Sequence, residues 1–186
     1  MTNLPNLLTL ARVILSFLLV FLLLQPEPAA KIAALAVFAA AALTDWWDGR
    51  IARRRGLISQ FGVLMDPIAD KVLVLCAFGA FVWLRVAPGW MVLLIAAREI
   101  LITGLRMVAL AKGKALPAEA AGKIKAAFQM GTISLTLLFL VARERFPGGW
   151  VPGAESGVHG LMFLTVLLTF SSGASFLWHN RERIFG

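Results

Sequence analysis

Charged residues are scarce in this sequence: they make up 15% of its 186 residues, whereas 60% are hydrophobic. A soluble globule of this size needs more polar surface than so few charged side chains can provide. The composition therefore predicts an integral membrane protein. Cysteine is scarcer still, because Cys76 is the single one. An intramolecular disulfide is excluded, and redox chemistry is not indicated.

Acidic residues are also in the minority, with 10 Asp and Glu against 18 Lys and Arg and a net charge of +8. Such an excess can indicate nucleic-acid binding, but basic residues clustered between apolar helices are typical of the positive-inside rule. We therefore expect membrane lipids as surroundings and no nucleic-acid partner. No small-residue cleavage pattern follows the first apolar run, so we expect a retained first helix with an amphipathic N-terminal start.

Six segments have the length of roughly 20 residues that a helix needs to cross the hydrocarbon core. They are 7–24, 29–48, 66–85, 90–110, 123–141 and 160–178. Prolines and glycines separate them, and the chain has no internal repeat and no room for a soluble domain. The predicted fold is one all-α membrane domain over residues 1–186, a bundle of six transmembrane helices.

Lysine and arginine predict the orientation of this bundle. If the N-terminus is cytoplasmic, that side collects Arg12, Arg50, Arg53, Arg54, Arg55, Lys71, Arg106, Lys112, Lys114, Lys123, Lys125, Arg181 and Arg183. The other side receives only Lys31, Arg85, Arg143 and Arg145. This asymmetry predicts that both termini are cytoplasmic.

Four aspartates, Asp45, Asp48, Asp66 and Asp70, lie between the second and third apolar cores. Those cores are too short to cross a membrane alone, so the aspartates are needed to complete both spans at their cytoplasmic edge. The spacings i, i+3 and i, i+4 put each pair on one face of its helix. Ionised groups at this depth face protein or water rather than lipid, and they tend to mark function.

Four carboxylates that face one another need a compensating cation. Oxygen ligands without a nearby histidine or cysteine favour Mg²⁺, Mn²⁺ or Ca²⁺ over zinc or copper. Four are enough for two metal ions, an arrangement that suits displacement at a phosphoryl group. The alternative is an ordinary interfacial charge cluster with the neighbouring arginines. Against it, Gly49, Ala52 and Gly62 leave room for a phosphorylated ligand, and Arg53 offers a fork for phosphate oxygens.

The eight residues from Asp45 to Asp70 have a fixed spacing. The pattern is Asp45, two residues, Asp48-Gly49, two residues, Ala52-Arg53, eight residues, Gly62, three residues, Asp66, three residues, Asp70. It resembles the full signature of the CDP-alcohol phosphatidyltransferases. The stretches NLPNLLTLARV, TDWWDGRIARR, FGVLMDPIADKV, AREILITGLRM and GKIKAAFQM resemble the bacterial phosphatidylglycerophosphate synthases of that family, while the chain after Val141 adds little.

This resemblance implies a homodimeric six-helix enzyme of the bacterial inner (cytoplasmic) membrane that depends on two ions of Mg²⁺ or Mn²⁺. Its activity would be transfer of a phosphatidyl group from CDP-diacylglycerol to the 1-hydroxyl of sn-glycerol 3-phosphate, with release of CMP on the cytoplasmic side. Asp45, Asp48 and Asp66 would be metal ligands, and Asp70 would be the general base that also touches a metal. The residues implied for CDP-diacylglycerol binding are Gly49, Ala52, Arg53 and Gly62, with Asn6 and Thr9 on the first helix.

The phosphate of the acceptor needs cations near the aspartates. Lys123 and Lys125 open the fifth segment, Arg106 ends the fourth, and Arg98 lies further inside it. We expect these four to bind the acceptor phosphate, although both lysines could instead be topology anchors. Arg98 with Glu99 could equally be a structural polar pair within the membrane. Arg12 could simply extend along the helix to reach the interface.

Other functions stay open. Another acceptor, such as serine or inositol phosphate, is compatible with the signature, which concerns only the CDP half of the reaction. A small cation transporter could also use carboxylates within the membrane, but it predicts acids near the midplane and an inverted repeat. A structural membrane scaffold gives no reason for the eight spaced residues.

Overall fold

A computed structural model describes the backbone of residues 4–55, 60–113, 116 and 120–185, and the side chains of 7, 9–44, 68–113, 116 and 120–181. These residues form six α-helices and no strand. The helices are α1 (Leu4–Leu24), α2 (Pro28–Arg55), α3 (Gln60–Trp83), α4 (Gly89–Ala111), α5 (Ala120–Arg145) and α6 (Val151–Phe185). The expectation of an all-α fold is confirmed for this part of the chain.

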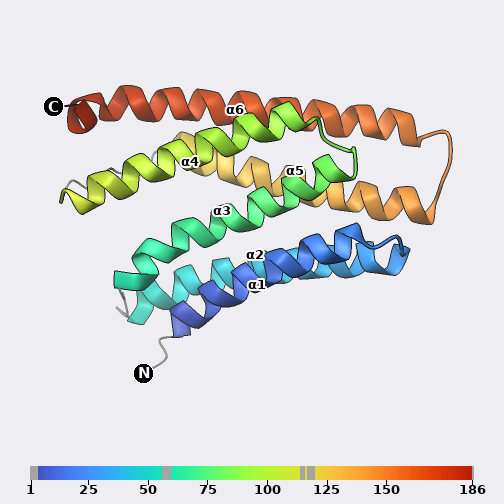
Figure 1. Cartoon of the computed structure of the whole chain (residues 1–186), viewed down its shortest axis with the longest axis horizontal. Coiled ribbons are helices and arrows are strands. Elements are labelled where there is room, and N and C mark those ends of the chain that lie inside the picture. The colour runs from blue at the N-terminus through green and yellow to red at the C-terminus, as the bar shows by residue number, and fades with distance from the viewer. Residues whose placement is uncertain (1–3, 56–59, 114–115, 117–119, 186) are drawn as a thin grey trace.

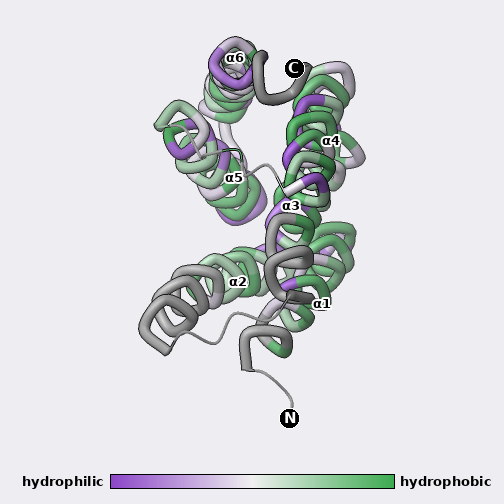
Figure 2. Tube along the Cα trace, turned by 90° about the vertical axis from the view of Figure 1, so that its left-hand side faces the viewer, coloured by the Kyte–Doolittle hydropathy of each residue, from purple (hydrophilic) through white to green (hydrophobic). Residues whose placement is uncertain are grey.

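The helices run side by side along the long axis, and successive helices point in opposite directions (Figure 1). Viewed end-on, α3 lies between a layer of α1 and α2 and a second group of α4, α5 and α6 (Figure 2). We call the end where α1 begins and α6 ends the terminal end, and the opposite one the far end. The end of α2 and the start of α3 also lie at the terminal end (Figure 1).

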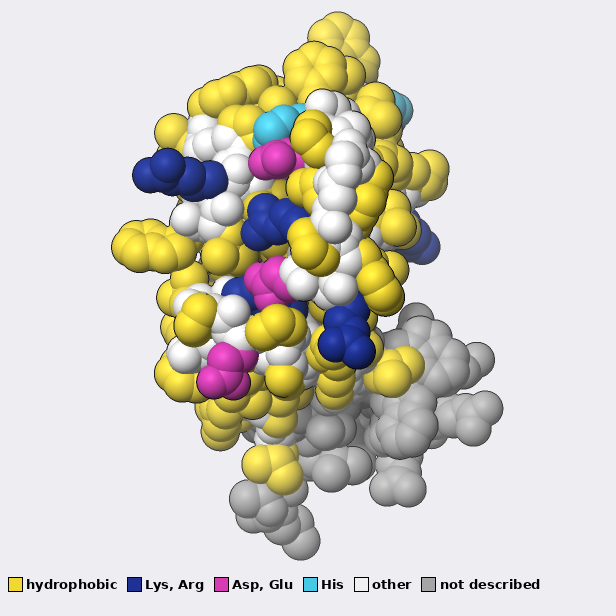
Figure 3. All heavy atoms as spheres, turned by 90° about the vertical axis from the view of Figure 1, so that its right-hand side faces the viewer, with side chains coloured by type: hydrophobic (Ala, Val, Ile, Leu, Met, Phe, Trp, Pro, Cys, Tyr) yellow, Lys and Arg dark blue, Asp and Glu magenta, His cyan; other side chains and the backbone are white. Residues whose placement is uncertain are grey.

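Tight turns at the far end join the helices. Lys31 is buried, and its Nζ donates to the carbonyls of Leu23 and Gln25, 2.5 Å from each, so it satisfies carbonyls at the end of α1. Arg85 adopts a left-handed conformation with φ of 57°, so α3 ends at Trp83 and not at residue 85 as predicted. Figure 3 shows this end face-on, with charged side chains gathered among apolar ones.

Several helices are longer than predicted, α6 and α2 most of all. Helix α6 begins at Val151 rather than at residue 160, although Pro152 and Gly153 suggested a loop. Proline is tolerated in the first turn of a helix because the amide that it lacks has no partner there. Helix α2 likewise continues to Arg55 instead of ending at residue 48, so Gly49 does not break it.

The core draws on all six helices, and within it α3 packs against α1, α4 and α5. Phe78 and Phe81 are fully buried and pack edge to face, with ring centroids 6.2 Å apart. Ala34 and Ala77 are also fully buried, and such small side chains let neighbouring helices approach closely. The core thus fixes α3 in the middle of the bundle.

Much of the outer surface is apolar. Large hydrophobic side chains such as Phe17, Leu93 and Trp178 are more than 60% exposed. Among the described residues, α5 and the Val151–Arg181 part of α6 are long and apolar enough to cross a membrane. Thr9–Leu24 and Pro28–Thr44 are shorter apolar helices. These features indicate a membrane protein, while the number of spans and their orientation stay predictions.

Candidate active site

The predicted metal ligands lie on two successive helices, and the end of α2 and the start of α3 both lie at the terminal end (Figure 1). Asp45 and Asp48 belong to α2, and Asp66 and Asp70 belong to α3. The side chains of Asp45, Asp48 and Asp66 are outside the described residues. The same holds for the predicted CDP-diacylglycerol contacts Gly49, Ala52, Arg53, Gly62 and Asn6. Their roles stay predictions, and the described part of the site lies around Asp70.

Asp70 is held by an arginine from the first helix. Arg12 Nη1 donates to Asp70 Oδ1 at 2.6 Å, and the Arg12 side chain is 2% exposed while that of Asp70 is 46% exposed. The alternative that Arg12 only extends to the interface does not fit a buried side chain bonded to Asp70. A guanidinium at this distance fixes the orientation of the carboxylate. Thr9, three residues before Arg12 on α1, is buried as well.

The next residue, Lys71, contacts a different part of the bundle. Its Nζ lies 2.5 Å from Glu99 Oε2 on α4. Glu99 is 1% exposed, and its Oε1 accepts hydrogen bonds from Lys125 Nζ on α5 and from Arg98 Nη1 at 3.2 Å. Neighbouring residues of α3 are therefore anchored in opposite directions, Asp70 to α1 and Lys71 to α4.

Polar residues of α5 and α6 complete these contacts. Gln129 Nε2 donates to Glu99 Oε1 and to Thr169 Oγ1, each at 3.4 Å. Arg98 Nη2 donates to Ser172 Oγ at 2.8 Å. We define Lys71, Arg98, Glu99, Lys125 and Gln129 as the Glu99 cluster. It draws on α3, α4 and α5, and α6 covers it.

Glycine at position 173 makes room for this arrangement. A Cβ built there would lie 3.2 Å from Arg98 Nε and 3.4 Å from its Cγ. Contacts that short are tighter than an aliphatic carbon normally makes, so Arg98 would have to shift. The small residue on α6 thus allows the arginine to lie flat against that helix.

The Glu99 cluster has an excess of positive charge. Lys71, Arg98 and Lys125 carry three positive charges against the one carboxylate of Glu99. The Arg98 side chain is only 11% exposed, and within the described residues its Nε has no hydrogen-bond partner. A partly buried group of cations with a spare donor can bind an anion such as a phosphate.

The four predicted acceptor cations do not all meet. Arg98 and Lys125 come together on Glu99, whereas Arg106 and Lys123 occupy exposed positions. Lys123 and Lys125 are two residues apart, which puts them on nearly opposite faces of a helix. Lys125 is 3% exposed and bonded to Glu99. A lysine that served only as a topology anchor would be exposed, so this alternative does not fit Lys125.

Several residues of the site were missed from the sequence. Lys71, Gln129, Thr169 and Ser172 were not predicted to contribute, and Glu99 was weighed only as a partner of Arg98. An acid inside an apolar segment is itself a signal, because a buried carboxylate needs partners. Lys71 carried no comparable signal, since a lysine at the cytoplasmic edge fits the general bias in basic residues.

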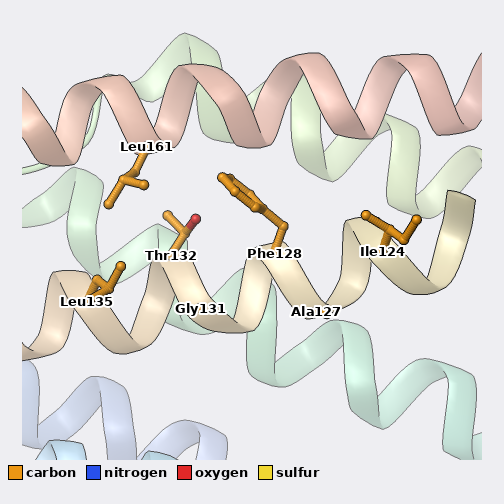
Figure 4. A pocket seen from close by; sticks show the side chains of 7 residues that line it. All are labelled: Ile124, Ala127, Phe128, Gly131, Thr132, Leu135 and Leu161. Carbon is orange, nitrogen blue, oxygen red and sulfur yellow. The ribbon is translucent and has the colours of Figure 1, made fainter.

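An apolar groove of about 430 Å³ lies between α5 and α6. Figure 4 shows its lining, with Ile124, Phe128, Thr132 and Leu135 on α5 and Leu161 on α6. This lining carries no charge, so the groove has no group that would hold a phosphate or a metal. The chemistry is therefore to be sought at Asp70 and the Glu99 cluster.

Comparison with known proteins adds independent evidence. Residues 2–171 match the family model of CDP-alcohol phosphatidyltransferase. The CDP-diacylglycerol–glycerol-3-phosphate 3-phosphatidyltransferase of Bacillus subtilis (strain 168) is 39% identical over 196 residues, covering 99% of this chain and 98% of that protein. The protein of the same name from Escherichia coli (strain K12) is 40% identical over 182 residues, covering 94% of this chain and 93% of its own length. A probable phosphatidylglycerophosphate synthase of Mycobacterium tuberculosis (strain ATCC 25618 / H37Rv) is 37% identical over 139 residues, 73% of this chain and 66% of that protein.

Proposed function

Since the chain belongs to the CDP-alcohol phosphatidyltransferase family, we propose that it transfers a phosphatidyl group from CDP-diacylglycerol to sn-glycerol 3-phosphate. The products are phosphatidylglycerophosphate and CMP. The observation that carries this proposal within the structure is the Glu99 cluster. This group of residues, whose net charge is positive, begins at Lys71, one residue from Asp70, which the family signature assigns to the reaction centre.

The donor set fits a magnesium or manganese site. Asp45 and Asp48 belong to α2 and Asp66 and Asp70 to α3, and the end of α2 and the start of α3 both lie at the terminal end (Figure 1). The Asp70 carboxylate is about half exposed, so its contact with Arg12 does not bury it. Carboxylates are the ligands that these ions prefer. Bound there, two ions would offset negative charge on the pyrophosphate of CDP-diacylglycerol.

Asp70 acts as the general base. A carboxylate oxygen takes the proton from the acceptor hydroxyl as the hydroxyl oxygen forms its bond to the phosphorus of the phosphatidyl group. The bond from that phosphorus to the oxygen of CMP breaks, and CMP leaves with the electron pair. Arg12 fixes the orientation of the Asp70 carboxylate during this step, because it is bonded to Oδ1 from a buried position.

Lys125 and Arg98 hold the phosphate of the acceptor. Both are mostly buried and share Glu99, so they are pre-arranged before the acceptor binds. Lys123 and Arg106 are exposed. Their role is to attract the negatively charged sn-glycerol 3-phosphate from a distance rather than to contact its phosphate. A cluster of net positive charge favours an acceptor that bears a phosphate over one such as serine.

The site faces the cytoplasm in this proposal, and the protein is a homodimer with six spans in a bacterial inner membrane. Support comes from the bias of lysine and arginine toward the terminal end and from the position of both the first and the last helix end there. A cysteine replacing Leu57, with Cys76 substituted, should react only with reagents applied from the cytoplasmic side. Labelling from outside would reverse the orientation.

The activity is tested with purified protein, CDP-diacylglycerol in mixed micelles, Mg²⁺ and a panel of acceptors, by following CMP release. We expect turnover with sn-glycerol 3-phosphate and little with serine or inositol phosphate. A preference for another acceptor would leave the family assignment intact and refute this substrate. Omission of the divalent ion should abolish turnover.

A further inference from the structure

Glu99 is an unexpected residue at the centre of a phosphate site. Its side chain is 1% exposed and lies among Lys71, Arg98 and Lys125. A carboxylate repels a phosphate and cancels part of the positive charge that would attract it. Glu99 therefore needs a role other than contact with the acceptor.

We propose that Glu99 is a positioning residue, which holds the acceptor-binding cations at a fixed place relative to Asp70. It does so without touching either substrate. This inference rests on the proposed function, since it assumes that Lys125 and Arg98 bind the acceptor phosphate. It goes further by assigning the contact that aligns the acceptor with the base.

The two oxygens of Glu99 have separate partners. Oε1 accepts from Lys125 Nζ, from Arg98 Nη1 at 3.2 Å and from Gln129 Nε2 at 3.4 Å, all on the acceptor side. Oε2 lies 2.5 Å from Lys71 Nζ on α3. One carboxylate thus ties the acceptor cations of α4 and α5 to the helix that carries the base.

The base is fixed from the other side of α3. Asp70 Oδ1 accepts from Arg12 Nη1 at 2.6 Å, while the adjacent Lys71 contacts Glu99. Helix α3 lies between α1 and the group of α4 and α5, as Figure 2 shows. These two ion pairs therefore set the position of Asp70 relative to Lys125. Side chains arranged before binding lower the cost of aligning the acceptor hydroxyl with the base.

Electrostatics explains why this position requires an acid. Lys71, Arg98 and Lys125 repel one another, and Lys125 is 3% exposed. Without Glu99, the buried Lys125 would lose its hydrogen-bonded counter-ion. A buried charge without a partner is unfavourable, so the side chain would move. A neutral residue at position 99 would thus displace the cations from the phosphate.

Glu99→Gln tests the proposal because it keeps the shape and removes the charge. Steady-state rates of CMP release are measured with the full-length enzyme in mixed micelles, varying each substrate in turn, together with the thermal unfolding temperature. Glu99→Asp keeps the charge on a shorter side chain. Thr165→Val is the matched control, since it removes a buried contact between α6 and α5, the 2.9 Å hydrogen bond of Thr165 with Thr132, which lies one helical turn from Gln129 and includes no member of the cluster.

We expect Glu99→Gln to raise the KM for sn-glycerol 3-phosphate by roughly 10- to 100-fold while the KM for CDP-diacylglycerol stays the same. Glu99→Asp should raise it less, because the charge remains. Thr165→Val should lower the unfolding temperature and leave both KM values unchanged. If Glu99→Gln behaves like this control, Glu99 is only a structural contact and the proposal is refuted. A lower KM for the acceptor would also refute it, because Glu99 would then compete with the phosphate for the cations.

Lys71→Met keeps the test decisive if Glu99→Gln does not fold. Lys71 is 28% exposed, so its loss is easier to tolerate, and Glu99 keeps Lys125 and Arg98. Misalignment with Asp70 should lower kcat by roughly tenfold or more. An unchanged kcat would refute the proposal. Failure of the proposed function is seen separately, as a wild-type enzyme that releases no CMP with sn-glycerol 3-phosphate.

Discussion

Replacing Lys125 with methionine should weaken acceptor binding far more than donor binding. Lys125 is 3% exposed, and its Nζ bonds to Glu99 Oε1. Methionine has a similar length and fills the same apolar space, so the substitution removes a charge with little change of volume. The net charge of the Glu99 cluster falls from +2 to +1, since two cations and one carboxylate remain.

The size of the effect follows from the kind of contact that is lost. A hydrogen bond to a charged group contributes about 1.5 to 3 kcal/mol, which corresponds to roughly a 10- to 100-fold change in affinity. We therefore expect the KM for sn-glycerol 3-phosphate to rise by that factor. The KM for CDP-diacylglycerol should stay within about twofold, because its predicted contacts lie on α1, α2 and α3.

Lys123→Met provides the matched control, since the two lysines are two residues apart on α5 and only Lys125 is buried. An exposed charge contributes at most about 1 kcal/mol, or about a fivefold change, and added salt should remove the effect. CMP release is measured at low and high salt for both variants. Equal effects of Lys123→Met and Lys125→Met, or equal changes in both KM values, would refute the assignment of Lys125 to the acceptor phosphate.

Three further predictions concern other parts of the site. Alanine at any one of Asp45, Asp48 or Asp66 should abolish CMP release without loss of membrane insertion, and near-normal turnover would contradict the metal site. Arg12→Met should lower kcat by up to about 100-fold with little change in the acceptor KM, because Asp70 loses its orienting partner; an equal rise in both KM values would instead indicate a general packing defect. Gly173→Ala should raise the acceptor KM, because the new Cβ would lie 3.2 Å from Arg98 Nε. Gly160→Ala on the same helix is the control. Its new Cβ would have no atom within 4 Å, so both KM values should stay unchanged in the same kinetic assay.

The sequence by itself determined the kind of protein and the family. Apolar segments of near-constant length can form little other than membrane helices, because backbone groups in lipid must be satisfied within each segment. The eight residues from Asp45 to Asp70 lie within a short stretch of chain, so their spacing is readable without a fold. Both inferences depend on local order along the chain.

Helix boundaries were less well determined by the sequence. Pro152 suggested a loop, yet it lies in the first turn of α6. Further along this helix, Val158 and Met162 pack into the core. Arg85 was expected inside a helix but adopts the left-handed turn that returns the chain toward α4. In each case, packing of neighbouring helices decided a boundary that local propensity left open.

Only the tertiary structure decided which charges meet. Lys71, Glu99 and Lys125 come from three different helices, so their contacts depend on how those helices rotate and pack around α3. The sequence grouped Lys123 with Lys125 because both begin the same segment, but the helical repeat turns one outward and buries the other. Arg12 looked like a residue that reaches the interface, and its partner lies 58 residues away on α3. A buried ion pair is set by long-range packing, which the order of residues along one helix does not specify.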